Sequence, residues 1–314
     1  MTTRLWWIVG AAALTCGVAP LQAQESPAKP GTTQRVLDDS KPTDWRALDP
    51  ENTLYVELAG GRVIIELAPA FAPAHVANIR KLARDRYWDG LSILRSHDNY
   101  VVQWGDPDAG TPKAKPLGRA RTQLPSEFAR DATGAAMLAL SDHDGWALET
   151  GFAQGFAVAR DKREGKAWLT HCYGSVGAGR DNAADSSNGT ELYVVIGQSP
   201  RHLDRNITLV GRVIFGMELL SALPRGTGPL GFYEKPEQRV ALRSIRLLAD
   251  VPQRDRTTIE VMRTDTKTWD ALIESRRNRR DDWYLRPAGH INVCNVPLPT
   301  RVPKAAKFPA GSRK

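Results

Sequence analysis

Two short runs of alternating apolar residues, joined by a pair of glycines, constrain the fold of this chain more than any other feature. Aliphatic side chains occupy every second position of residues 54–58 and of residues 63–67, and Gly60 and Gly61 stand between the runs. Successive side chains of a strand point to opposite faces, so each run has one face to bury, and the glycine pair permits a tight turn. The pattern predicts a β-hairpin.

Further elements follow in an order typical of a mainly β chain. Pro73 begins a run with apolar residues at helical spacing. Residues 108–170 predict a long loop and then several short strands, and residues 192–196 predict a strong strand. Residues 214–223 have helical spacing, and residues 240–247 predict a last strand with a local irregularity.

The stretch from Asp89 to Pro107 places one arginine and one glutamine among apolar residues. A buried strand ending at Leu94 and another starting at Tyr100 would be joined by a polar turn, which brings Arg95 and Gln103 close together on neighbouring strands. A guanidinium beside an apolar patch is costly to desolvate without partners. Arg95 is therefore either a member of a structural ion pair or a group that waits for a ligand.

Composition indicates a globular protein. The chain has 314 residues, of which 41% are hydrophobic and 25% are charged, which is enough to bury a core and excludes disorder along the whole chain. The formal charge is +8, and its one dense cluster, at residues 276–280, is typical of a solvated helix face. No stripe of basic and aromatic residues accompanies the charge, so nucleic acid is not an expected partner.

No cofactor or metal site is predicted. The six histidines lack metal-ligand spacing, and residues 142–145 lack the spaced acidic ligands of a calcium loop, so we expect a polar turn there. Glycines at 174–179 resemble a phosphate loop, but the residues that follow form a polar coil instead of an amphipathic helix.

The first residues predict export. A positive start and a short apolar run end at Ala23 before polar residues, which is typical of a cleaved signal peptide over residues 1–23. Cys16 also suggests a lipid anchor, but the preceding Thr15 matches such processing poorly. We expect a periplasmic protein without stable membrane insertion after cleavage. Its remaining cysteines, Cys172 and Cys294, either pair in this oxidising compartment or remain two buried free thiols.

The two ends of the mature chain differ from its middle. Residues 24–50 are rich in proline and polar residues without periodicity, and they predict a flexible linker. Residues 251–314 predict a C-terminal extension, with a strand around Val261 and a helix capped by Thr268.

Four segments in order resemble the cyclophilin family of peptidyl-prolyl isomerases over about residues 51–250. The first is the strand pair with its proline-headed helix. Residues 90–106 resemble the family's Phe-His-Arg…Gln-Gly-Gly-Asp, with the arginine and the glutamine at the family's separation. Asn-Gly-Thr-Glu-Leu-Tyr at 188–193 resembles Asn-Gly-Ser-Gln-Phe-Phe, and residues 202–213 resemble Trp-Leu-Asp…Phe-Gly-Lys-Val. The resemblance implies an eight-stranded closed antiparallel β-barrel capped by two helices, here with a long insertion and the C-terminal extension.

The resemblance also assigns site residues. Arg95 takes the family's catalytic arginine position and Gln103 its supporting glutamine, while Leu94 and Trp104 replace a histidine and a glycine of the family pattern. The implied substrate-binding positions are Tyr100, Val101, Glu191, Leu192, Tyr193, His202, Leu203 and Ile207. Several of these depart from the family, which has Gln at 191 and often Trp at 202 and His at 207.

The implied chemistry needs no nucleophile. An X-Pro amide resists rotation by about 18–20 kcal/mol, and an enzyme need only seat the proline ring and favour the twisted amide, whose nitrogen can accept a hydrogen bond. Arg95 suits this role because it is always charged and offers five donors. We also expect that the Glu191 carboxylate could pair with Arg95 and reduce activity.

Two functions remain open at this point. The first is a prolyl isomerase that acts on proline-containing polypeptides and assists the folding of exported proteins. The second is a catalytically weak or inactive cyclophilin-like binding module, which works as a chaperone or scaffold. Intact Arg95 and Gln103 favour the first, whereas the altered pocket and the extension favour the second. No pattern in the chain specifies an oligomeric state.

Overall fold

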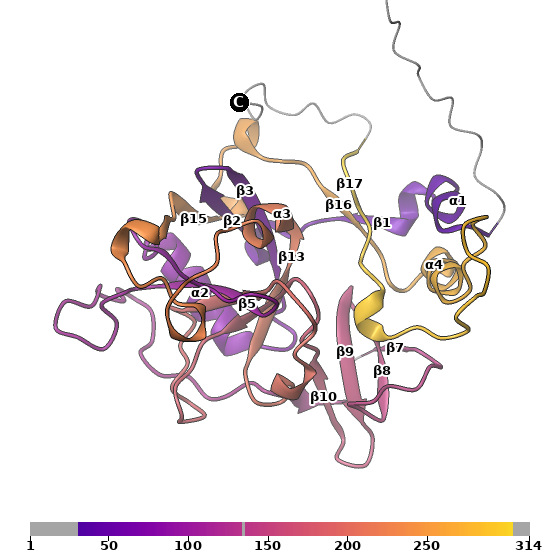
Figure 1. Cartoon of the computed structure of the whole chain (residues 1–314), viewed down its shortest axis with the longest axis horizontal. Helices are drawn as coiled ribbons and strands as arrows, with labels where there is room; N and C mark the ends of the chain where they lie inside the picture. Colours follow the sequence, from indigo (N-terminus) through magenta and orange to yellow (C-terminus); the bar gives the residue numbers. More distant parts are fainter. Residues whose placement is uncertain (1–30, 134–135, 304–314) are drawn as a thin grey trace, which may run out of the picture.

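A computed structural model describes residues 31–133 and 136–303 (Figure 1). Its largest element is a nine-stranded antiparallel sheet that includes the predicted hairpin, whose strands pair from Thr53–Glu66 to Leu58–Gly61. In order across the sheet, the strands are β14 (Val240–Ala241), β4 (Ser92–Ser96), β5 (Val101–Gly105), β12 (Leu192–Val195), β11 (Ser175–Ala178), β13 (Leu209–Phe215), β3 (Gly61–Leu67), β2 (Thr53–Leu58) and β15 (Ser244–Leu247).

This sheet is curled but is not the closed eight-stranded barrel that the resemblance implied. Its two edge strands, β14 and β15, follow each other in the chain, and no ladder joins them within the described residues. The backbone N–H of Leu242 donates to Leu91 beside β4, whereas that of the next residue, Arg243, donates to Glu57 in β2. The last strand is thus interrupted where it passes from one edge to the other, at the irregularity expected in residues 240–247.

Two helices accompany the sheet, as expected. Helix α2 (Pro73–Arg84) starts with proline, whose missing N–H costs nothing at a helix start, and it buries its apolar face in the main core. Helix α3 (Met217–Ser221) is shorter than the predicted run. Phe215 remains in β13 because Gly216 turns the chain at φ 84°, and a β-carbon there would lie 2.5 Å from the Arg62 carbonyl oxygen.

The insertion forms a second antiparallel sheet of five short strands, which lies beside the main sheet (Figure 1). The long loop followed by short strands is therefore confirmed. In order across this sheet, the strands are β6 (Arg130–Asp131), β10 (Lys166–Leu169), β9 (Phe156–Asp161), β8 (Glu149–Ala153) and β7 (Leu138–Ala139).

A third sheet joins the two ends of the described chain. Strand β1 (Trp45–Ala47) pairs with β16 (Glu260–Met262), which pairs with β17 (Thr300–Arg301), and α1 (Thr33–Asp38) packs beside α4 (Lys267–Arg277) (Figure 1). The predicted flexible linker is wrong over its described part, residues 31–50, because this part forms α1 and β1. The local pattern did not reveal these elements, since their partners come from more than 200 residues later in the chain. Residues 1–30, and with them the predicted signal peptide, lie outside the described residues.

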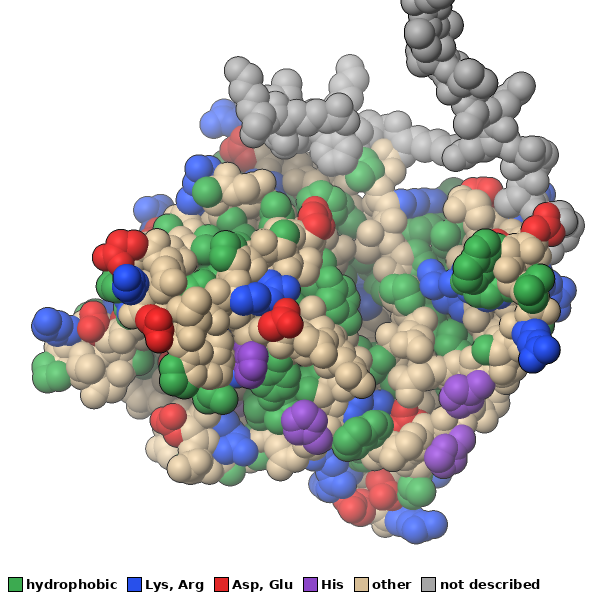
Figure 2. Space-filling view, in the orientation of Figure 1, with side chains coloured by type: hydrophobic (Ala, Val, Ile, Leu, Met, Phe, Trp, Pro, Cys, Tyr) green, Lys and Arg blue, Asp and Glu red, His purple; other side chains and the backbone are tan. Residues whose placement is uncertain are grey.

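The extension is attached by packing and by one covalent bond. A disulfide joins Cys172 to Cys294, so the two cysteines are not free thiols. Thr266 caps α4, whereas the predicted cap, Thr268, donates to Asp44 at 2.8 Å. Figure 2 shows hydrophobic side chains in the hollow between the main sheet and the extension, where Phe152, Met217 and the disulfide line a cavity of about 230 Å³.

Short 3-10 turns connect these elements. They are η1 (Pro42–Asp44), η2 (Pro50–Asn52), η3 (Arg201–Leu203), η4 (Pro229–Gly231), η5 (Pro236–Gln238), η6 (Leu248–Asp250), η7 (Gln253–Asp255) and η8 (Val293–Asn295). No helix within the described residues is long and apolar enough to cross a bilayer.

Candidate active site

A bulge in β4 places Arg95 on the outer face of the sheet. Ile93 pairs with Trp104 and Arg95 pairs with Gln103. Trp104 and Gln103 are neighbours in β5, so Leu94 is one extra residue in β4 between these two pairs. Without this bulge, residues 93 and 95 would share a face. Instead Ile93 is fully buried in the main core, while Arg95 lies beside Gln103 in a cleft. The predicted proximity of Arg95 and Gln103 is confirmed.

The Arg95 guanidinium is held by neutral acceptors. Its Nε donates to the Leu230 carbonyl at 2.6 Å, Nη1 donates to Gln103 Oε1 at 3.2 Å, and Nη2 donates to His97 Nδ1 at 3.0 Å. The aromatic rings of Tyr100 and Phe232 lie 5.5 and 5.3 Å from its carbon Cζ.

Burial lowers the pKa of Arg95, yet an arginine stays charged at any pH a protein tolerates. None of the ion pairs formed within the described residues includes Arg95. Of the two alternatives for this residue, the structural ion pair is therefore the one the structure does not support.

Glu191 contacts Gln103 and not Arg95. Gln103 Nε2 donates to Glu191 Oε2 at 2.7 Å, which leaves Gln103 Oε1 for Arg95. Burial raises the pKa of Glu191, and the nearby Asp181 and Asp106 act in the same direction, whereas the hydrogen bond from Gln103 opposes them. The expected pairing of Glu191 with Arg95 is thus replaced by a relay through the amide of Gln103.

Apolar side chains form the floor of the cleft. Val101 and Tyr193 are buried in one cluster with Val195, and Tyr100 and Ile207 pack against it. Tyr193 lies directly opposite Gln103 in the β5–β12 pair, so the two side chains share the outer face of the sheet. Leu203 completes the predicted residues that line the cleft.

Two predicted pocket residues lie elsewhere. Leu192 is fully buried in the main core, because side chains alternate along β12 and Tyr193 takes the outer face. His202 is exposed at η3 and does not line the cleft. A core position and a turn position cannot be told from pocket positions by residue type alone, which is why the sequence placed both in the site.

The cleft has a volume of about 630 Å³ and contains residues that the sequence did not suggest. Leu230 and Phe232 come from the loop that holds η4, and Phe232 forms an isolated bridge with Arg95. Arg180 and Asp181 also line the cleft. The glycines at 226, 228 and 231, just before Phe232, were the one local signal in the sequence for this loop. Within the described residues, no group of histidine, cysteine and acidic side chains could hold a metal ion.

Comparisons with known proteins show the family of this chain. The model of the family described as "Cyclophilin type peptidyl-prolyl cis-trans isomerase/CLD" matches residues 53–247. The chain belongs to the cyclophilins.

Curated relatives and a solved structure resemble parts of this chain. A "Probable peptidyl-prolyl cis-trans isomerase" of Brucella suis is 27% identical over 58% of this chain and 76% of its own. "Peptidyl-prolyl cis-trans isomerase B" of Bacillus subtilis is 31% identical over 41% of this chain and 86% of its own. A crystal structure of a cyclophilin from Hirschia baltica has a TM-score of 0.64 and 28% identity, and covers 86% of this chain and 97% of its own. The first two relatives are named as peptidyl-prolyl cis-trans isomerases and the third as a cyclophilin.

Proposed function

We propose that this cyclophilin isomerises X-Pro bonds by seating the proline ring on the apolar floor and hydrogen-bonding the twisted amide through Arg95. The observation that carries the proposal is the state of the guanidinium. Three of its five N–H groups have neutral acceptors, so two remain for a ligand beside the floor formed by Val101 and Tyr193. A positive charge fixed before the substrate arrives stabilises a developing lone pair without reorganisation.

The proposed substrates are proline-containing segments of exported proteins in the periplasm. The pattern of residues 1–23 supports export, and a disulfide between Cys172 and Cys294 suits an oxidising compartment. Fractionation of cells that express the full chain tests this location. A full-length protein that remains in the cytoplasm, with its first residues uncleaved, would contradict this location.

An isomerase assay on wild type and Arg95→Ala tests the mechanism. We expect the variant to keep its circular dichroism spectrum and to lose about a hundredfold in kcat/KM, which is the usual effect of removing one such donor. Arg225→Ala is the matched control, because Arg225 pairs with Asp98 and backbone carbonyls outside the cleft. Equal rates for wild type and Arg95→Ala would refute the proposed mechanism.

The alternative function, a binding module, is favoured by a specific observation. Gln103 uses its amide group on Glu191 and its carbonyl on Arg95, so the site partly satisfies itself. The two functions can be separated with a substrate protein whose refolding rate is limited by the isomerisation of an X-Pro bond. An isomerase accelerates refolding at catalytic concentration, whereas a binder acts only near a stoichiometric one.

A further inference from the structure

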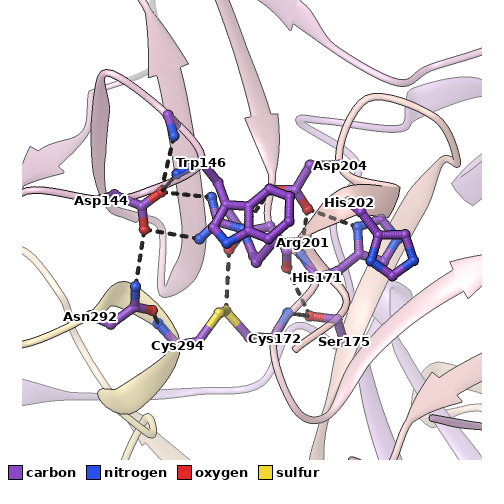
Figure 3. A network of polar contacts seen from close by, with 12 residues as sticks. Asp144, Trp146, His171, Cys172, Ser175, Arg201, His202, Asp204, Asn292 and Cys294 are labelled. Carbon is purple, nitrogen blue, oxygen red and sulfur yellow. Dashed lines mark hydrogen bonds and ion pairs between the residues drawn. A yellow bond between two sulfur atoms is a disulfide. The ribbon is translucent and has the colours of Figure 1, made fainter. Parts of the chain in front are cut away.

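The hydroxyl of Tyr193, at the floor of the cleft, contacts a buried polar network. Figure 3 shows the part of this network that contains His171, Asp204, Arg201 and Asp144. The Tyr193 hydroxyl lies 2.9 Å from His171 Nε2, and the two rings are nearly parallel, at 9°. On its other side, His171 Nδ1 lies 2.9 Å from Asp204 Oδ1, which also accepts from the His171 backbone N–H. His171 is fully buried and Tyr193 is 4% exposed.

The chemistry of these groups fixes the direction of the hydrogen bonds. A carboxylate only accepts, so the proton of neutral His171 resides on Nδ1, and Nε2 accepts from the Tyr193 hydroxyl. Burial lowers the pKa of His171 and raises that of Tyr193, so both rings are neutral near pH 7. The phenol therefore has one defined hydrogen-bond acceptor.

Asp204 is in turn held by a buried ion network. Arg201 Nε donates to Asp204 at 2.6 Å, and the two other nitrogens of Arg201 donate to Asp144 at 3.0 and 3.2 Å. Asp144 also accepts from the backbone N–H of Trp146 and from the Asn292 side chain. Through His171, the network thus connects Tyr193 with the insertion, at Asp144, and with the C-terminal extension, at Asn292. Figure 3 shows Asn292 next to the disulfide.

The neighbouring strand also leaves space for the phenol ring. Gly177 of β11 lies opposite Tyr193, and a β-carbon at residue 177 would overlap the ring and hydroxyl of Tyr193. A buried network of charges contributes little net stability compared with apolar packing of the same volume, so its clearest effect is to fix geometry. Here the geometry that it fixes is that of the Tyr193 ring.

We propose that His171 is a positioning residue of this cyclophilin, which fixes the Tyr193 ring as the floor of the proline site through its hydroxyl. The inference rests on the proposed function, in which Tyr193 lies under the proline ring. His171 does not line the cleft, so it acts through Tyr193 and not on the substrate. The five-stranded sheet of the insertion and the C-terminal extension thereby support the site, although none of their residues lines the cleft.

A double-mutant cycle with Tyr193→Phe and His171→Ala tests the proposal by isomerase kinetics. The floor contacts the proline ring in the ground state and in the transition state alike, so its loss raises KM and leaves kcat nearly unchanged. We expect each single variant to raise KM about fivefold, as the loss of one net hydrogen bond does. The double variant should show the KM of the single ones, since both remove the same contact.

Two further variants separate positioning from general destabilisation. His171→Gln keeps a polar group near the phenol and should restore part of the KM. His75→Ala is the matched control, because His75 is also fully buried and bound to a carboxylate, that of Glu127 at 2.7 Å, but lies on α2 outside the cleft. This control should lower the free energy of unfolding and leave KM unchanged. Additive KM increases in the cycle, or a KM increase in His75→Ala of the same size, would overturn the proposal.

A nitrogen-15 NMR spectrum of the histidine side chains tests the network without any assay of activity. We expect the Nδ1–H tautomer for His171 in wild type and a change of its Nε2 signal in Tyr193→Phe. An Nε2–H tautomer would overturn the inference. If the spectrum agrees but wild type and Arg95→Ala have equal isomerase rates, then the proposed function fails while the Tyr193–His171 contact stands.

Discussion

Gln103 lies between a pure donor and a pure acceptor, Arg95 on one side and Glu191 on the other, at 3.2 and 2.7 Å. Its amide therefore has a single orientation, with the carbonyl oxygen toward Arg95 and the amide nitrogen toward Glu191. The family pattern has glutamine at the position of Glu191, and a glutamine side chain can both donate and accept hydrogen bonds. The carboxylate of Glu191 thus fixes the amide of Gln103 and adds a partly buried acidic group to the cleft.

Glu191→Gln should stabilise the protein at neutral pH by on the order of 1 kcal/mol, because it removes a partly buried carboxylate while Gln103 keeps an acceptor. The pKa of Glu191 is raised in the folded state, so the folded protein favours the protonated carboxyl group. The stability that this group contributes is fully present at low pH and is lost as the pH rises through the folded-state pKa. The advantage of Glu191→Gln in urea unfolding should therefore shrink toward acidic pH. Glu237→Gln, at an exposed position, is the control, and an advantage that does not depend on pH would contradict the expectation.

Phe232→Ala should reduce kcat/KM of the isomerase about threefold to tenfold, because the ring 5.3 Å from the Arg95 guanidinium helps to hold it in place. Leu230→Ala is the matched control. It removes an exposed side chain from the same loop but keeps the carbonyl that accepts from Arg95 Nε. If both variants lose the same activity, then the loop and not the aromatic ring is responsible.

Glu66→Gln should lower the free energy of unfolding at pH 7 by about 3–5 kcal/mol, because it leaves two arginines facing a buried site without their carboxylate. Glu66 accepts from Arg212 at 2.7 Å and from Arg46 at 2.6 Å, and Arg212 also donates to the Gly155 carbonyl of the insertion. Urea unfolding of wild type and variant measures the difference.

The same ion pairs predict an acid transition. Burial by itself would raise the pKa of Glu66, but Arg212 and Arg46 lower it below the usual 4.5. The stabilisation is therefore present above the unfolded-state pKa and is lost as the pH falls through the folded one. The gap between wild type and Glu66→Gln should begin to narrow below about pH 4 and close as the pH falls through the lowered folded-state pKa. Asp131→Asn, which removes an exposed pair with Lys166, should show a much smaller gap at every pH.

Replacing both Cys172 and Cys294 by serine should cost about 3–5 kcal/mol of stability, since the bond closes a loop across 122 residues of the unfolded chain. Urea unfolding with and without a thiol reductant measures the effect. The reductant should lower the midpoint of wild type and leave that of the double serine variant unchanged. A wild-type midpoint that does not respond to full reduction would argue against a stabilising disulfide.

Local patterns sufficed for the hairpin at 53–67, for α2 and for the proximity of Arg95 and Gln103. In each case the periodicity of nearby residues determines which side chains share a face. They failed for residues 31–50, where β1 forms only because β16 provides hydrogen-bond partners, and for Leu192, where one step along β12 separates the cleft from the core. The shape of the sheet, curled and open, depends on the break at Leu242 and Arg243.

By itself the sequence determined the hairpin at 53–67, helix α2, the family resemblance and the arginine and glutamine of the cleft, because these depend on residue types at short and fixed separations. Only the tertiary structure decided that Glu191 contacts Gln103, that Phe232 lies beside Arg95, that Cys172 bonds Cys294 and that His171 holds Tyr193. These contacts join residues that are 22 to 137 positions apart. Such pairs form only when the whole chain has folded, since no local periodicity places one member opposite the other.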